Sequence, residues 1–249
     1  MKKKTILVAA IAVMLVAALV VGGTLAYFTD KTEVKDNVFT VGNVKIGIRE
    51  VFDKDSAVLI PGKDINKDVF VKNTGAQDAY VRVHIAIPSA LDDGDPSFDA
   101  AHNFLHFNFT GSSVAAGQWS WIPRMTDGEG YLGNGAGNWN FYTTTVDGVD
   151  YNVYVVTYRS ILPAGEETKT QALDKVYLDR SVDAVQGDNG SFTYKDNKGN
   201  SITLGAEDNV KVLVVAEGVQ AEGFNNAYTA LNTAFGTPGA EGYVSPFNK

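Results

Sequence analysis

Residues 141–158 read FYTTTVDGVDYNVYVVTY, and this stretch decides the fold class. Two runs rich in threonine, tyrosine and valine, at residues 141–146 and 151–158, flank the pair Asp147-Gly148. Side chains of these types favour β-strands. An Asp-Gly pair between two such runs is typical of a two-residue hairpin turn, because both positions tolerate a positive φ. The sequence therefore predicts two antiparallel strands joined by a tight turn.

Short runs of the same kind recur along the chain, separated by clusters of glycine, aspartate and asparagine. The further strand candidates are residues 69–72, 80–87, 105–109, 176–178 and 210–216, together with the alternating Val44, Ile46 and Ile48. This spacing predicts an all-β fold, an antiparallel β-sandwich. Residues 89–103 and the glycine-rich residues 126–140 are interpreted as long surface loops of a single domain.

One segment near the end of the chain has a helical period instead. Its apolar residues recur at intervals of three and four: Phe224, Ala227, Tyr228, Leu231, Ala234 and Phe235. Gly236 and Pro238 stand where a helix ends. The pattern predicts an amphipathic helix that packs on the sandwich, with a helix that binds a partner as the alternative.

Composition excludes several classes of function. The chain of 249 residues contains no cysteine, which excludes disulfides, zinc–thiolate sites, iron–sulfur clusters and cysteine nucleophiles. Its formal net charge is −8, and no cluster of basic residues lies outside the N-terminus. Because a nucleic-acid-binding protein needs lysine and arginine concentrated on one face, nucleic acid is not expected as a partner.

The N-terminus has the three parts of an export signal. Lys2, Lys3 and Lys4 precede an uninterrupted apolar run over residues 6–21, and small residues follow. Thr24 and Ala26 occupy the positions that a signal peptidase reads, so cleavage is expected between Ala26 and Tyr27. Residues 27–249 would then form the secreted domain, with a formal net charge of −11. An uncleaved membrane anchor is the alternative, because about 20 apolar residues span a bilayer.

The histidine pair at His102 and His106 has the HxxxH spacing of zinc peptidases. Those enzymes need a glutamate after the first histidine as general base, and Asn103 stands there instead. The alternation of Leu105 and Phe107 with polar residues also favours a strand. Since residues four apart on a strand lie about 13 Å apart, no metal site is predicted here, and no cofactor is expected.

Two other groups of residues have side chains that could bind a ligand. Asp93, Asp95, Ser97 and Asp99 alternate as calcium ligands do, but no closing glutamate follows and Pro96 interrupts the pattern. Solvated loop acids are the preferred interpretation. Trp119, Trp121 and Trp139 could stack on sugars or belong to the core. No nucleophile elbow, phosphate-binding loop or dinucleotide fingerprint is present, so no catalytic residue is predicted.

Two regions resemble a known family. The first comprises GGTLAYFTD at residues 22–30 and NVFTVGNV at residues 37–44, and the second comprises LIPGKD at 59–64, VKNTG at 71–75 and AYVRV at 79–83. These residues, with QAEGF at 220–224, are similar to the TasA, CalY and camelysin family. The resemblance implies a jelly-roll subunit that is exported, processed by a SipW-type signal peptidase and polymerised into extracellular biofilm matrix fibres, with itself and an accessory nucleating protein as partners.

In such fibres the N-terminal strand of one subunit completes the sheet of the next. Carried onto this sequence, the donated strand lies within residues 27–39 and its apolar residues are Tyr27, Phe28, Val34, Val38 and Phe39. The charged residues between them deter premature pairing of the edge. Alternatively, the segment pairs within its own subunit and the protein stays monomeric. A camelysin-type cell-surface metallopeptidase and a surface adhesin or sugar-binding module are the other function hypotheses.

Overall fold

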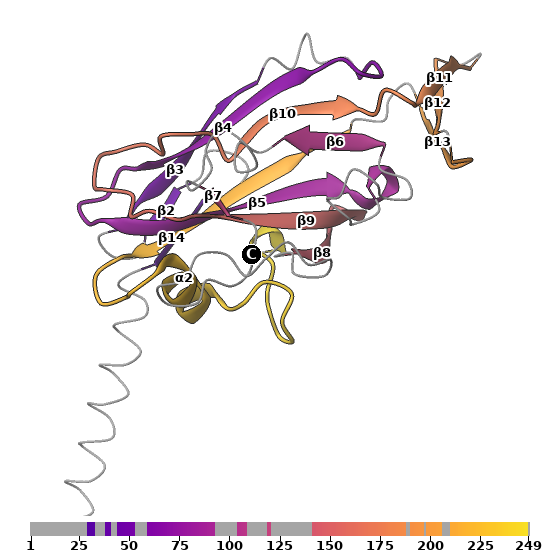
Figure 1. The fold of residues 1–249 in the computed structure, drawn as a ribbon. Helices are drawn as coiled ribbons and strands as arrows, with labels where there is room; N and C mark the ends of the chain where they lie inside the picture. Colours follow the sequence, from indigo (N-terminus) through magenta and orange to yellow (C-terminus); the bar gives the residue numbers. More distant parts are fainter. Residues whose placement is uncertain are drawn as a thin grey trace, which may run out of the picture.

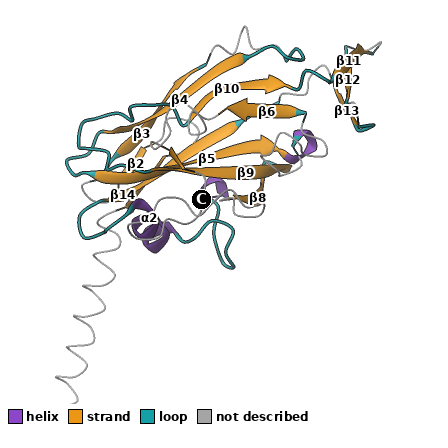
Figure 2. Cartoon of the chain, in the orientation of Figure 1, coloured by secondary structure: helices purple, strands orange, loops and turns teal. Residues whose placement is uncertain are grey.

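The computed structural model describes residues 29–32, 38–40, 44–52, 59–92, 104–108, 119–120, 141–187, 190–196, 198–205 and 210–248, with the backbone alone at 29–32, 38–40 and 108. These residues form two antiparallel sheets packed face to face, a small third sheet and an α-helix (Figure 1). Strands dominate the described chain (Figure 2). The prediction of an all-β sandwich is therefore confirmed.

The larger sheet has the strand order β2-β1-β14-β5-β9-β7, with β8 pairing with β9. Its strands are β1 (Thr29–Thr32), β2 (Val38–Thr40), β5 (Ala79–Pro88), β7 (Trp119–Ser120), β8 (Phe141–Val146), β9 (Val149–Tyr158) and β14 (Leu213–Gln220). The predicted hairpin is confirmed, because β8 and β9 pair on either side of the turn. Asp147 has φ 51° and Gly148 has φ 80°, the two positive values that a tight hairpin turn of this kind requires.

The smaller sheet has the order β3-β4-β10-β6. Its strands are β3 (Ile46–Val51), β4 (Ile65–Asn73), β10 (Leu173–Leu178) and β6 (Leu105–Asn108). The core lies between the sheets, where Val81, Val83 and Ile85 of β5 pack in one cluster with Val69 and Val71 of β4, all inaccessible to solvent. Alternate residues of β5 therefore face the sandwich interior, and the residues between them face the opposite side of the sheet.

The helix α2 (Ala227–Phe235) covers that opposite side (Figure 1). The Asn226 side chain accepts a hydrogen bond from Thr229 N (2.9 Å) at its start, and Gly236 ends it with φ 85°. Ala230 and Leu231 pack against Tyr80 and Val219 of the sheet. The helix thus packs on the sandwich as expected. No helix in the described part of the chain is long and apolar enough to cross a membrane.

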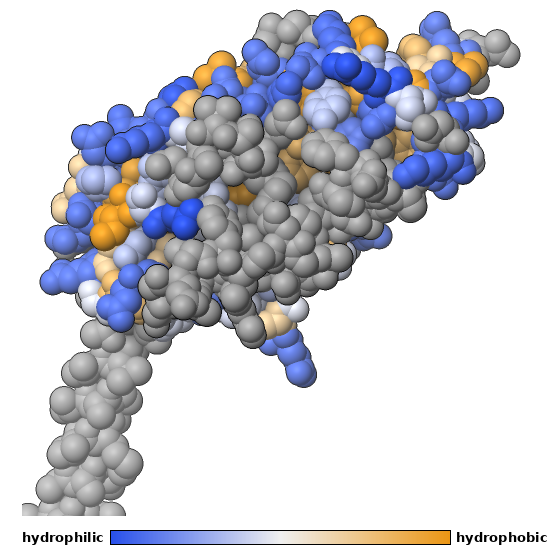
Figure 3. All heavy atoms as spheres, in the orientation of Figure 1, coloured by the Kyte–Doolittle hydropathy of each residue, from blue (hydrophilic) through white to orange (hydrophobic). Residues whose placement is uncertain are grey.

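A third sheet projects from one end of the sandwich (Figure 1). It consists of β11 (Asp183–Gln186), β12 (Phe192–Lys195) and β13 (Ser201–Leu204), which the sequence pattern did not predict. Tyr194 packs into the main core, whereas Val185 and Phe192 are exposed. Hydrophobic residues form small groups among hydrophilic ones on this sheet and on the rest of the visible described surface (Figure 3). The described surface visible in that view therefore shows no large apolar patch.

Several strand boundaries differ from those expected. β4 begins at Ile65 and β10 at Leu173, whereas the sequence pattern predicts starts at residues 69 and 176. The strand expected at residues 210–216 begins at Leu213 and continues to Gln220. The first long loop begins with a short 3₁₀ helix, η1 (Ser89–Leu91), and a second one, η3 (Pro246–Asn248), ends the described chain. The rest of that loop beyond Asp92, up to residue 103, the whole of residues 126–140 and the export signal at residues 1–26 lie outside the described residues.

Candidate functional site

The N-terminal strands lie at one edge of the larger sheet. β1 pairs antiparallel with β14, with Thr29 opposite Val219, Asp30 opposite Gly218 and Lys31 opposite Glu217. β2 pairs with the other side of β1. Of the residues predicted for a donated strand, Val38 and Phe39 lie in β2, and Tyr27, Phe28 and Val34 lie outside the described residues. The structure therefore places the described parts of residues 27–39 on the sheet of their own chain.

The ladder that holds β1 is short. It runs from Thr29 to Lys31, whereas β5 pairs with the other side of β14 along its whole length, from Leu213 to Gln220. A strand held by few backbone hydrogen bonds opens at low free-energy cost, since local stability follows local pairing and burial. The outer side of β14 is therefore a part of the sheet where one strand is easily replaced by another.

Directly behind this edge lies a buried ion pair. Glu217 of β14 and Arg82 of β5 are opposite each other in the sheet, and their residues are 0% and 1% exposed. Arg82 donates from Nε (2.7 Å) to Glu217 Oε2, and its Nη2 lies 2.6 Å from the same oxygen. Charges buried this deeply persist only when they are paired and hydrogen-bonded. The pair therefore links β14 firmly to the centre of the sheet.

His84 extends this cluster along β5. Its Nε2 lies 3.1 Å from Glu217 Oε2 and its Nδ1 lies 3.1 Å from the Tyr142 hydroxyl, with the ring fully buried. A neutral ring protonated on Nε2 satisfies both contacts. Burial raises the pKa of Tyr142, so its hydroxyl keeps its proton and donates a hydrogen bond to His84 Nδ1, while it accepts a hydrogen bond from Ser245 Oγ, 3.3 Å away. His84 therefore acts as a buried structural histidine.

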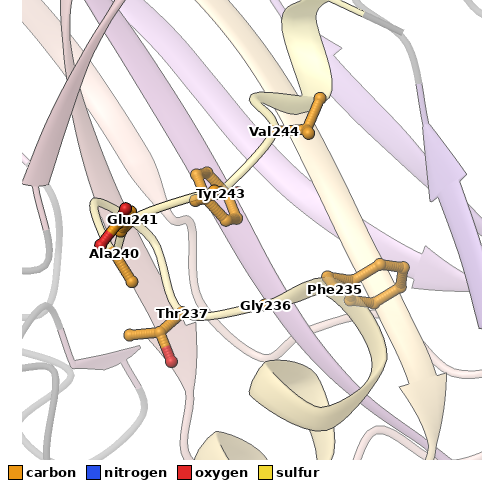
Figure 4. A pocket seen from close by; sticks show the side chains of 8 residues that line it. Phe235, Gly236, Thr237, Ala240, Glu241, Tyr243 and Val244 are labelled. Carbon is orange, nitrogen blue, oxygen red and sulfur yellow. The ribbon is translucent and has the colours of Figure 1, made fainter.

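Arg82 also holds the end of α2. It donates from Nη1 to Asn232 Oδ1 (2.9 Å) and from Nη2 to the carbonyl oxygen of Gly236 (3.1 Å), so it satisfies a group that the helix end leaves open. Beyond Gly236 the chain loops back through Tyr243, and this loop lines an open pocket of about 240 Å³ next to the rings of Phe235 and Tyr243 (Figure 4). The Arg82 guanidinium thus connects β14, β5 and the C-terminal segment.

The sequence pattern alone did not identify Arg82, His84 and Glu217 as a buried polar cluster. A signal for them exists in residues 80–87, where Arg82 and His84 alternate with Val81, Val83 and Ile85. In a strand this pattern puts both polar side chains on the face opposite the apolar one. A second element must then cover that face and supply partners. The partner Glu217 comes from 135 residues further along the chain, which no local pattern reveals.

The histidines do not form a metal site in the part of the chain that the structure describes. His106 lies on β6, so the strand expected there is confirmed, and its Nε2 contacts Asp179 Oδ2 (2.7 Å). His102 lies outside the described residues, and His84 is enclosed by Glu217 and Tyr142. No group of three histidine, aspartate or glutamate residues among the described ones could hold a metal ion. The described donor set does not fit a zinc-peptidase centre.

The other candidate ligand residues are partly accounted for. Trp119 is 1% exposed, and its indole Nε1 donates to the Thr170 carbonyl (3.1 Å) beside the Tyr158 ring, so it belongs to the core rather than to a sugar platform. Asp92, which directly precedes the alternating aspartates, is buried and accepts hydrogen bonds from the Tyr154 hydroxyl (2.7 Å) and from Asn152 Nδ2 (3.0 Å). The remaining candidates, Asp93, Asp95, Ser97, Asp99, Trp121 and Trp139, lie outside the described residues.

A family model matches the N-terminal part of the chain. Residues 1–95 match a family model described as camelysin metallo-endopeptidase. No curated protein matches the chain significantly. The matched segment contains the N-terminal strands β1 and β2 and continues through β5, which carries Arg82 and His84. The family match therefore covers the edge strands and one side of the buried cluster, whereas β14 lies beyond it.

Proposed function

We propose that this chain, whose residues 1–95 match the camelysin family model, is a secreted structural subunit related to TasA and CalY. It assembles into extracellular biofilm matrix fibres when the N-terminal strand of one subunit adds to β14 of the next. The observation that supports this function is the position of β1, an N-terminal strand held on the outer side of β14 by a ladder from Thr29 to Lys31.

Strand addition reuses an existing slot. In the single chain, β1 fills the place beside β14, and in a fibre the same place is filled by β1 of a neighbour. Backbone hydrogen bonds are equivalent in the two arrangements, so exchange of an identical element between subunits has a small free-energy cost. High local concentration then favours the linked form, and each added subunit offers a further strand and a further slot.

Export processing makes the strand available. Cleavage after Ala26 leaves Tyr27 as the first residue, two positions before β1 begins at Thr29. In the precursor, the apolar run at residues 6–21 is joined to the strand and holds it at the membrane. A SipW-type peptidase is the proposed processing partner. Mass spectrometry of secreted protein that shows residues 1–26 still attached contradicts this step.

Disulfide trapping tests the strand exchange directly, because the chain has no cysteine of its own. One preparation carries Thr29→Cys and another carries Val219→Cys. Opposed Cα atoms of antiparallel strands lie about 4.5–5.5 Å apart, within the span of about 4.4–6.8 Å that a disulfide bridges. We expect the mixture, assembled and then mildly oxidised, to give a disulfide-linked dimer on a non-reducing gel.

The matched control replaces the acceptor position. Val215→Cys lies on the same strand and face, but about 13 Å along it from the position opposite Thr29, so its mixture with Thr29→Cys should give no dimer above background. A single chain that carries both Thr29→Cys and Val219→Cys reports pairing within one subunit as a shifted monomer band. If the mixture yields no dimer while that monomer band forms, the strand stays on its own chain and the proposed function is wrong.

The family description names a second candidate function, a metallo-endopeptidase. The described residues supply no three-ligand metal group to support it. We expect purified secreted protein to leave casein intact both with and without a chelator such as EDTA. Digestion that stops when chelator is added, and returns with zinc, would establish the enzyme instead. Binding of the monomer on a glycan array would favour the adhesin hypothesis.

A further inference from the structure

The charge on β14 is concentrated at one position. Among the residues of the strand, LVVAEGVQ, Glu217 alone carries a charge, and its carboxylate is buried. The contacts from Arg82 and His84 all reach its Oε2 atom from the β5 side. On the other side of β14, the residue opposite Glu217 is Lys31 of β1. Residues directly opposed in an antiparallel pair share a face of the sheet.

We propose that Lys31 is the residue that sets the register of the N-terminal strand on β14, through its charge opposite Glu217. This inference rests on the proposed function for its role in the fibre, but it applies equally to a strand docked on its own chain. It makes Glu217 the specificity-determining residue of the slot: the slot accepts a strand that presents a basic residue at this one position. Lys31, Glu217 and Arg82 then form a single row across three strands.

The neighbouring residues support this assignment. The strand and the residue after it read Thr29-Asp30-Lys31-Thr32-Glu33. A slip by one residue in one direction places Asp30 opposite Glu217 and also turns every side chain to the wrong face. A slip by two residues that moves Glu33 into the position of Lys31 places that glutamate opposite Glu217. Opposed like charges are destabilising, and more so beside a buried carboxylate. Lys31 is the sole basic residue among residues 29–33.

The decisive experiment exchanges the two charges. The variant Lys31→Glu with Glu33→Lys keeps composition and net charge, but it moves the basic residue two positions along the strand. In the native register Thr29 lies opposite Val219, and in the register that brings residue 33 opposite Glu217 it lies opposite Ala221. Thr29→Cys is therefore combined, in the full secreted chain, with Val219→Cys in one set and with Ala221→Cys in another.

We expect the parent charges to give at least tenfold more disulfide with Val219→Cys than with Ala221→Cys, because diagonal partners lie about 7–8 Å apart. The exchanged charges should reverse this preference. Lys31→Met should lower the Val219 bond at least threefold, and Lys31→Arg should retain it. Lys35→Met, which removes a lysine from the same segment, is the matched control and should leave both yields unchanged.

Each outcome decides the proposal. It is overturned if the exchanged variant keeps the Val219 bond at the parent level, if Lys31→Met behaves like Lys35→Met, or if the exchange removes both bonds. Monomer and dimer bands are scored separately. Register is read from either band, so a preference that follows the charge in the monomer band alone supports the role of Lys31 while it contradicts strand exchange between subunits. Dimers whose register does not change with the position of the charge support strand exchange between subunits and contradict the role of Lys31.

Discussion

A secreted protein that begins at Gly42 should form no filaments. It lacks both β1 and β2, so each subunit keeps an acceptor edge on β14 but has no strand to donate. Because strand addition is the proposed link between subunits, and the absence of cysteine excludes a disulfide link, the expected loss is complete rather than partial. Negative-stain electron microscopy of the truncated and the full secreted protein, at equal concentration, measures it.

A peptide of residues 27–41 is the control for folding. If the truncated protein keeps its slot, the peptide should bind it with a stoichiometry of one, which isothermal titration calorimetry measures, and no filaments should appear. A truncated protein that fails to bind the peptide has lost the slot itself. Filaments that persist without residues 27–41 would refute strand addition from the N-terminus.

The second large effect concerns stability. Arg82→Met should lower the free energy of unfolding by about 3–5 kcal/mol, because it leaves the buried Glu217 carboxylate without its main partner. It also removes the donors to Asn232 Oδ1 and to the Gly236 carbonyl, which end α2. Urea unfolding followed by tryptophan fluorescence measures the change.

The same substitution at Arg49 is the matched control. Arg49 makes a two-pronged ion pair with Glu167, with both N–O distances 2.7 Å, but its side chain is 47% exposed. Exposed pairs contribute about 0–1 kcal/mol, so Arg49→Met should cost much less than Arg82→Met. Adding Glu217→Leu to Arg82→Met should recover part of the loss, because it removes the unpaired charge. Equal effects at Arg82 and Arg49 contradict the structural role given to the buried pair.

Local patterns predicted the parts of the fold that local physics determines. The Asp147-Gly148 turn and the runs on either side specify a hairpin without help from the rest of the chain. The alternation in residues 80–87 follows from one face meeting the sandwich core. The end of α2 was predicted correctly at Gly236, which adopts the positive φ that ends many helices.

The misplaced end of β14 shows where such patterns fail. The sequence pattern predicts a strand that ends at residue 216. The next two residues are a glutamate and a glycine, and both residue types disfavour strands. In the structure Glu217 is paired with Arg82 of β5. Gly218 stands where an added Cβ would lie 2.9 Å from the Ile46 side chain, so the packing of β3 requires a residue without one. Both reasons depend on strands far away in sequence.

The candidate site was predictable to a similar extent. The resemblance of residues 22–44 pointed to an N-terminal strand that pairs with an edge, but neither the identity of that edge nor the register could be derived from sequence. The small third sheet was missed because each of its strands has four residues, and because only Tyr194 packs deeply. Strands so short give little periodicity to detect.

The strand order also has a consequence for the time course of synthesis. β14 lies between β1 and β5, so the first strands of the chain are completed by nearly the last one. Because a chain is made from its N-terminus, β1 is synthesised long before β14, which begins at Leu213. During that interval β2 can pair with one side of β1, but the β14 that pairs with its other side does not yet exist in its own subunit. A nascent subunit that emerges beside a finished one can therefore meet a foreign β14 before its own exists.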